Sequence, residues 1–162
     1  MSDRNETAEQ IIRLLTERRQ TLAVAESCTG GLIGHLLTEI PGSSEAFLGG
    51  VIVYANTIKE KVGVPAAVLQ SHGAVSAQVA QALATGVRIW TEADYGLAVT
   101  GITGPSGATE TKPVGLVYIA LAAPGHLEVQ QHNFSGTRSE VKQSSAEAAL
   151  ALLTLELTRN PA

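Results

Sequence analysis

Three short, continuous apolar runs, each followed by a polar turn, constrain the fold of this chain more than any other feature. They lie at residues 21–25 (TLAVA), 47–54 (FLGGVIVY) and 95–100 (YGLAVT). A run without polar alternation is typical of a strand buried between layers of helices, which is the setting of a parallel sheet. The polar turns that follow such strands mark the side of an open α/β sheet where ligands bind.

The remaining segments predict the other elements of the fold. Residues 114–122 and 127–134 are typical of a β-hairpin, and the alternating second strand is expected at the sheet edge. The order of elements predicts a three-layer α/β/α sandwich around a mixed sheet of about five strands. Apolar side chains at helical spacing predict five helices. Three are expected to begin at a capping residue, namely Asn5, Asn56 (for residues 56–62) and Ser76. The other two cover residues 32–40 and the segment from Arg138 onward.

Composition and charge limit the class of function. Apolar residues make up 44% of the 162 residues and charged residues 16%, which is typical of a globular chain. The net charge of −4 argues against a nucleic-acid partner. No run approaches the roughly 18 apolar residues of a membrane span, so we expect no membrane partner. With Cys28 as the lone cysteine and no apolar signal core, we expect a single cytoplasmic domain over residues 1–162.

The turn at residues 26–31 (ESCTGG), between the first apolar run and a helix, is the first candidate site. Backbone N–H groups at a helix start are unpaired and suit a phosphate or a developing oxyanion. Ser27 and Thr29 are expected to project from this turn, and Gly30 and Gly31 would let a ligand approach closely. The alternative is that one of the two hydroxyls simply caps the helix.

Lys59, five residues after Tyr54, is the second candidate. A lysine that is buried at a strand end beside a serine has a lowered pKa and can accept the serine proton. The alternative is an ordinary surface lysine, which is what we expect of Lys61.

The long irregular segment at residues 101–113 is the third candidate, and it holds Thr103 and Gly104. Irregular segments of this length in a compact domain are usually functional, and the alternative is a disordered hairpin tip. Arg138 begins the last helix, where its charge opposes the helix dipole. It therefore needs another role, such as gripping a phosphate or carboxylate, unless it is simply solvated.

Other residues point less clearly to chemistry. The four histidines show no metal-ligand spacing, so we expect no metal site. Cys28 is an alternative nucleophile, although no histidine base lies near it in the sequence. Trp90 continues the apolar side of the helix that follows Ser76 and is expected in the core.

Five segments together resemble the CinA C-terminal domain family over almost the whole chain, from about residue 8 to 158. The family includes stand-alone amidases that hydrolyse nicotinamide mononucleotide to nicotinic acid mononucleotide and ammonia. The resemblance implies a three-layer α/β/α fold and assembly into dimers or larger homo-oligomers. The segments are AESCTGG (25–31), YANTIK (54–59), HGAVS (72–76), GITGPSGATETKPVG (101–115) and FSGTR (134–138).

Residue by residue, the resemblance places a serine nucleophile on Ser27, a lysine base on Lys59 and an orienting tyrosine on Tyr54. In the implied mechanism Lys59 takes the Ser27 proton, an acyl-enzyme forms as ammonia leaves, and water hydrolyses the ester. This chemistry requires no metal and no cofactor. The resemblance also places the phosphate side of the site on Thr29, Gly30, Gly31, Thr103, Gly104 and Arg138.

Two departures from the family pattern and two rival interpretations remain. The sequence after Lys59 is one residue shorter than the usual pattern, which leaves the end of that helix open. Longer CinA proteins carry an N-terminal domain linked to ADP-ribose hydrolysis, an activity that we do not expect of residues 1–162.

The rival interpretations are a nucleotide-binding module without turnover, suggested by the family's link to competence and DNA damage, and an inert oligomeric scaffold. A lysine base beside a serine favours the enzyme, because binding alone requires neither.

Overall fold

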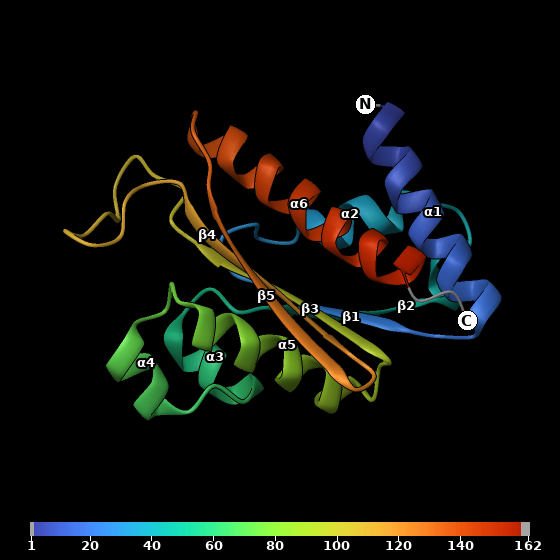
Figure 1. Ribbon diagram of the computed structural model, residues 1–162, viewed down its shortest axis with the longest axis horizontal. Coiled ribbons are helices and arrows are strands. Elements are labelled where there is room, and N and C mark those ends of the chain that lie inside the picture. The colour runs from blue at the N-terminus through green and yellow to red at the C-terminus, as the bar shows by residue number, and fades with distance from the viewer. Residues whose placement is uncertain (1, 160–162) are drawn as a thin grey trace.

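The computed structural model describes residues 2–159, and a mixed five-stranded sheet lies at its centre (Figure 1). The strands are β1 (Leu22–Glu26), β2 (Phe47–Ile52), β3 (Tyr95–Gly101), β4 (Leu116–Ala123) and β5 (His126–Asn133). They lie in the order β2-β1-β3-β4-β5. β1 is parallel to β2 and β3, β4 is antiparallel to β3, and β5 is antiparallel to β4. The expected mixed sheet and the edge position of the last strand are confirmed.

Helices cover both faces of the sheet and complete the three layers (Figure 1). One layer holds α1 (Ser2–Arg18), α2 (Leu32–Thr38) and α6 (Arg138–Arg159). The opposite layer holds α3 (Asn56–Val62), α4 (Ala66–His72) and α5 (Ala77–Thr91). None of the helices within residues 2–159 is long and apolar enough to cross a membrane.

The two faces of the sheet carry side chains of different size, because successive residues of a strand point to opposite faces. The face toward α1, α2 and α6 carries large aliphatic side chains: Leu22, Val24, Leu97, Val99, Ile119 and Leu121. The face toward α5 carries alanines: Ala23, Ala25, Ala98, Ala120 and Ala122. The short side chains let α5 lie very close to the sheet, where a Cβ on Gly96 would stand only 2.2 Å from the Ala84 carbonyl oxygen.

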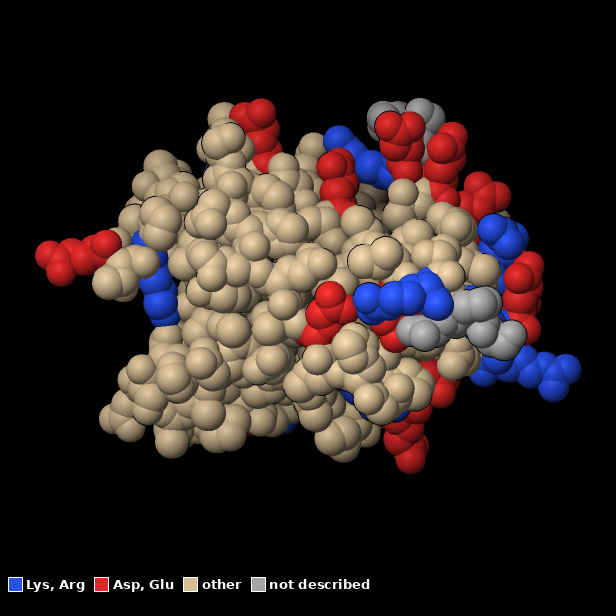
Figure 2. All heavy atoms as spheres, in the orientation of Figure 1, with Lys and Arg blue, Asp and Glu red and all other residues tan. Residues whose placement is uncertain are grey.

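The carboxyl ends of the three parallel strands meet at one end of the sheet. Glu26 of β1 pairs in register with Ile52 of β2 and Val99 of β3. The turns that follow these strands therefore come together, as expected for an open sheet of this type. The long β3–β4 connection projects from this end of the molecule (Figure 1), and charged side chains are sparse over it compared with the opposite end (Figure 2).

The starts of two helices differ from the sequence expectation. α1 already begins at Ser2, so Asn5 lies inside the helix and does not cap it. The polar residues that precede Ala8 form the exposed first turn of α1. Apolar spacing does not detect such a turn, because it contains no apolar residue. α3 begins at Asn56 itself, with Ala55 as its cap and no side-chain cap bond. The Ser76 cap of α5 is confirmed, because its hydroxyl accepts the N–H of Val79.

Two further features of the helical layer on the α5 side were not expected. Helix α4 was missed because it contributes no fully buried residue and so leaves no clear apolar stripe in the sequence. Trp90 was expected in the core, and this prediction is wrong because 66% of the residue is exposed. The buried stripe of α5 passes through Val87 and then turns toward Thr91, so Trp90 faces outward.

Candidate active site

Ser27 lies immediately after β1, in a turn that the neighbouring strands hold from both sides. Its backbone N–H donates to the Val99 carbonyl at 3.0 Å, and the carbonyl of the preceding Glu26 accepts the N–H of Val53 at 2.8 Å. Gly30 N–H donates to the Ser27 carbonyl at 3.2 Å, which closes the turn. The Ser27 side chain is buried from bulk solvent and lines a cavity. The turn is therefore a rigid support for the hydroxyl.

The carboxylate of Glu26 organises the same turn, a role that was not expected from the sequence. The side chain is buried and accepts three hydrogen bonds, from the Thr29 hydroxyl at 2.7 Å, Ile33 N–H at 2.8 Å and Gly34 N–H at 3.0 Å. A carboxylate at a helix start is favourable because the free N–H groups and the helix dipole compensate its charge. The only signal in the sequence was an acidic residue that ends an otherwise apolar run.

The Glu26 contacts change the interpretation of the predicted anion site. The N–H groups of Ile33 and Gly34 at the start of α2, expected to be open to a phosphate or oxyanion, are already bound to a carboxylate. The Thr29 hydroxyl is buried and also bound to Glu26. Gly30 and Gly31 follow with φ of 59° and 106°, values that favour glycine, so the chain turns sharply here.

Lys59 on α3 is almost fully buried, with 2% of the residue exposed. Its Nζ donates to the carbonyl oxygens of Val53 at 2.7 Å and Tyr54 at 2.9 Å. No carboxylate pairs with it within the described part of the chain. Burial lowers the pKa of the Lys59 ammonium below its ordinary value, and the nearby Cys28 thiol opposes that shift only in part. The surface interpretation is wrong for Lys59, whereas Lys61 is exposed as expected.

Ser27 and Lys59 line one cavity of about 180 Å³ at the carboxyl end of the sheet. No direct hydrogen bond joins the Ser27 hydroxyl to Lys59 Nζ among residues 2–159. The two groups therefore face a shared space in which a substrate can lie. The residues that line this space are Ser27, Cys28, Tyr54, Asn56, Lys59, Ala74, Val75, Thr100, Gly101 and Thr103.

The thiol of Cys28 also lines the cavity but is poorly suited to attack. Burial raises the pKa of Cys28 to about 12, although the Cys28 backbone N–H and the cations Lys59 and Lys142 oppose this rise. The thiol is therefore protonated at neutral pH, whereas the thiolate is the nucleophilic form. No histidine lies among the residues that line this cavity. The geometry favours Ser27 over Cys28.

Tyr54 and Arg138 form the rim of the cavity. Tyr54 is 64% exposed, and its hydroxyl accepts a hydrogen bond from Arg138 Nη2 at 3.3 Å. Arg138 Nη1 donates to the Gly104 carbonyl at 2.7 Å. One guanidinium at the start of α6 therefore ties Tyr54 to the β3–β4 connection. Thr103, next to Gly104 in that connection, is buried and lines the cavity.

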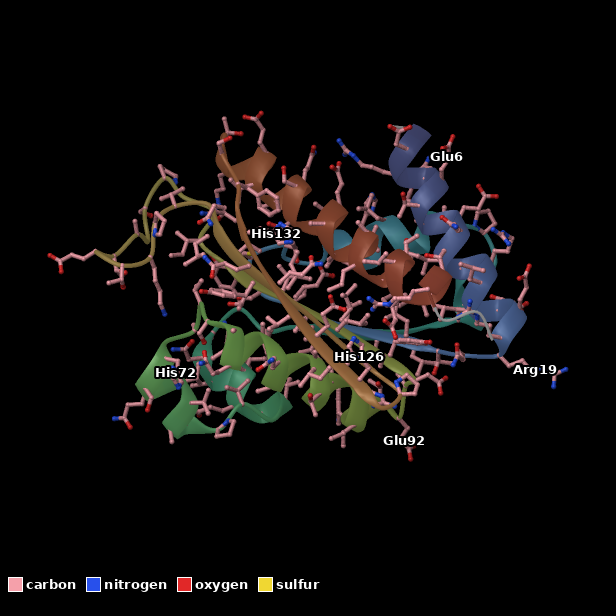
Figure 3. The ribbon with its side chains drawn as sticks, in the orientation of Figure 1. Glu6, Arg19, His72, Glu92, His126 and His132 are labelled. Atoms are coloured by element: carbon pink, nitrogen blue, oxygen red, sulfur yellow. The ribbon has the colours of Figure 1, made fainter. Side chains whose placement is uncertain are left out.

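The remaining titratable cluster of note lies at the opposite end of the sheet. His126 Nε2 is 3.3 Å from Glu128 Oε2 and 4.0 Å from Glu156 Oε2, a grouping that spacing along the sequence did not reveal. Arg159 Nη2 stands 2.6 Å from Glu156 Oε2 and 3.4 Å from Glu128 Oε2, so a cation of the chain already compensates both carboxylates. His72 and His132 lie far from His126 in Figure 3.

Comparison with known proteins identifies the family. A profile of the CinA C-terminal domain matches residues 4–157. The chain belongs to the CinA C-terminal domain family. It is 49% identical to a CinA-like protein of Acidobacterium capsulatum over 158 residues, 96% of this chain and 38% of that protein. It is 51% identical to a putative competence-damage inducible protein of Moorella thermoacetica over 141 residues, 86% of this chain and 34% of that protein.

Solved structures of the CinA family share the fold along their full length. The competence/damage inducible protein of Agrobacterium tumefaciens superposes with a TM-score of 0.92 at 37% identity, covering 96% of each chain. A CinA superfamily protein of Klebsiella pneumoniae gives a TM-score of 0.92 at 30% identity, covering 97% of this chain and 99% of its own. The curated relatives described above are longer, and this chain spans less than two fifths of their length.

The five segments that resemble the CinA family all reach the cavity or its rim. The HGAVS segment, to which the sequence analysis gave no role, supplies Ala74 and Val75 to the cavity wall. The Ala74 carbonyl accepts the Thr100 hydroxyl at 2.8 Å, which joins this segment to the end of β3. The shortened sequence after Lys59 still closes its helix, because Gly63 N–H bonds back to the carbonyls of Glu60 and Lys59.

Proposed function

We propose that this CinA-family protein hydrolyses the carboxamide of nicotinamide mononucleotide, releasing nicotinic acid mononucleotide and ammonia. Ser27 is the nucleophile and Lys59 is its general base. The observation that carries this proposal is a buried lysine without a counter-charge that shares a cavity with a buried serine hydroxyl. A structural role explains such a lysine poorly, because burying an unpaired charge destabilises a fold.

The contacts of Lys59 are compatible with its neutral form, and burial favours that form. A neutral amine has two N–H donors and one lone pair, whereas the ammonium has three donors. The carbonyls of Val53 and Tyr54 take two donors, so in the neutral amine the lone pair is the one position that no carbonyl occupies. The lowered pKa increases the fraction of this form near neutral pH. Lys59 can then accept the Ser27 proton through one bridging water, or directly when the two side chains approach within hydrogen-bond distance.

The proposed reaction proceeds in two balanced halves. Ser27 Oγ attacks the carboxamide carbon while its proton passes to Lys59, and the C–N bond then breaks as Lys59 returns the proton to the departing ammonia. Water attacks the resulting ester while Lys59 accepts its proton. The ester C–O bond then breaks as Lys59 returns that proton to Ser27 Oγ, which releases the acid and restores both residues. The N–H groups of Thr29 and Gly31 find no acceptor among residues 2–159, and they are candidates to stabilise the oxyanion.

The rim residues suit the rest of the nucleotide. Tyr54 and Arg138 would orient the substrate over Ser27, and Arg138 keeps N–H groups beyond those bound to Gly104 and Tyr54. Thr103 and Gly104 bring the β3–β4 connection to the same edge. This division places the carboxamide in the cavity and the phosphate at its mouth.

The deciding experiment is ammonia release from nicotinamide mononucleotide by the purified protein, with Ser27→Ala and Cys28→Ala as matched variants. Ser27→Ala should lose more than about a thousandfold in kcat, because removal of a nucleophile disables the whole catalytic unit. Cys28→Ala should remain within a few-fold of wild type, and a chelator should have no effect. If the wild type binds the mononucleotide but releases no ammonia, the binding-module interpretation replaces the enzyme.

A further inference from the structure

The first two turns of α6 carry two cations on the side that faces the cavity. Arg138 reaches Tyr54 and Gly104 on the rim. Lys142 follows four residues later, on the same side of the helix. Its Nζ lies 3.7 Å from the position that a Cβ on Gly30 would occupy, so its ammonium stands over the turn that holds Ser27. The sequence analysis gave Lys142 no role.

The charge of Lys142 is left uncompensated. The side chain is half-buried, and it has no hydrogen-bond or ion-pair partner in the described part of the chain. The nearby Glu26 carboxylate is already bound to three donors. Glu140, close by on α6, accepts the N–H of Thr137 and caps its own helix. The positive potential of Lys142 therefore acts on the cavity mouth, and it reaches the Cys28 thiol, whose pKa it lowers in part.

An anionic ligand at this mouth has few other cations available. The N–H groups of Ile33 and Gly34 at the start of α2 are not open to a phosphate, because Glu26 already occupies them. Lys59 is buried and bound to carbonyl oxygens, and Arg138 is partly committed to Gly104 and Tyr54. Of these three cations, Lys142 is the one whose N–H donors have no protein partner within residues 2–159.

We propose that Lys142 binds the phosphate of the substrate and makes the site prefer a mononucleotide over the corresponding nucleoside. This inference rests on the proposed function for the identity of the substrate. A phosphomonoester carries close to two negative charges at neutral pH, and an ammonium is a suitable point-charge partner for it. Arg138 acts beside Lys142, but its main contacts fix Tyr54 and the β3–β4 connection.

The test compares Lys142→Met with Lys142→Arg and with Lys61→Met, which removes an exposed lysine on α3. We measure kcat/KM for nicotinamide mononucleotide and for nicotinamide riboside, and take the ratio of the two. Lys142→Met should lower this ratio by about tenfold to a hundredfold, the size expected for one charge-assisted contact. Lys142→Arg should restore most of it, Lys61→Met should not change it, and thermal melts verify that each variant folds. A ratio unchanged in Lys142→Met overturns the proposal.

Equilibrium binding separates this inference from the proposed reaction. Calorimetry gives Kd for nicotinic acid mononucleotide and for nicotinic acid riboside in wild type and Lys142→Met. If the wild type prefers the mononucleotide and Lys142→Met loses that preference, the phosphate site stands even without any ammonia release. If ammonia is released but the preference persists in Lys142→Met, the reaction stands and the role of Lys142 is wrong. A wild type that neither binds nor hydrolyses the mononucleotide overturns both.

Discussion

The two ends of the central sheet treat buried charge in opposite ways. At the carboxyl end of β1, β2 and β3, Lys59 is 2% exposed and bonds only to carbonyl oxygens. At the other end, Glu156 is similarly buried at 5% exposed, but Arg159 pairs with it at 2.6 Å and His126 lies 4.0 Å away. Lys59 therefore lacks a counter-charge, whereas Glu156 is surrounded by compensating groups.

We propose that this difference separates a reactive site from a structural network. A buried ion that has a partner and hydrogen bonds is tolerated, whereas an unpaired one shifts its pKa toward the neutral form. The network at Glu156 ties the end of α6 to the β4–β5 hairpin through Arg159 and Glu128. In the proposed mechanism, the carboxyl end gives up local stability to keep an amine that can exchange a proton.

Replacement of the unpaired lysine should have the largest effect on activity. Lys59→Arg keeps the positive charge, but a guanidinium does not release its proton at accessible pH. We expect kcat to fall by about a hundredfold to ten-thousandfold, the usual contribution of a general base. Lys61→Arg, on the exposed side of the same helix, is the control and should be nearly silent. Full activity of Lys59→Arg in the ammonia assay would require a different base.

Removal of the rim arginine should have an intermediate effect. Arg138→Leu breaks the link between Tyr54 and the Gly104 carbonyl, so the rim loses its fixed geometry. We expect turnover of both the mononucleotide and the riboside to fall, on the order of tenfold, because small errors in positioning are costly. Arg13→Leu, an exposed arginine on α1, serves as the control. A loss restricted to the mononucleotide would instead assign Arg138 mainly to the phosphate.

The charged network should matter for stability and not for activity. Glu156→Gln leaves Arg159 and His126 without their buried carboxylate, and the free energy of unfolding should fall by about 1 kcal/mol, a modest value because Arg159 is half exposed. Turnover should stay at the wild-type level, because this cluster is at the far end of the sheet. Chemical denaturation and the ammonia assay on the same sample check both expectations. A large loss of activity in a folded Glu156→Gln protein would contradict the division between the two ends.

The sequence was sufficient to predict the layers and the mixed sheet, because these follow from apolar periodicity. Parallel strand ends predict that the turns before Ser27 and Lys59 converge, whereas the pairing of the two residues as nucleophile and base came from the resemblance to the CinA family. The sequence was not sufficient to predict the role of Glu26. The carboxylate of this residue at the end of β1 accepts N–H groups at the start of α2, and no apolar periodicity encodes these contacts. The core position predicted for Trp90 was wrong, because helical spacing alone does not show which side of the helix is buried at its last turn. Lys142 was missed because the orientation of α6 over the Ser27 turn is a tertiary property.

The most direct test of the central claim is the pKa of Lys59 itself. Protein labelled with ¹³C at lysine Cε is titrated by NMR, and the Lys59 signal is assigned from its absence in Lys59→Arg. Because burial lowers this pKa, the Lys59 signal should titrate clearly below the value near 10.4 of an ordinary lysine. In that pH window the unfolded chain binds more protons, so the free energy of unfolding should also rise with pH. A Lys59 signal that titrates at the value of an ordinary lysine would contradict the account.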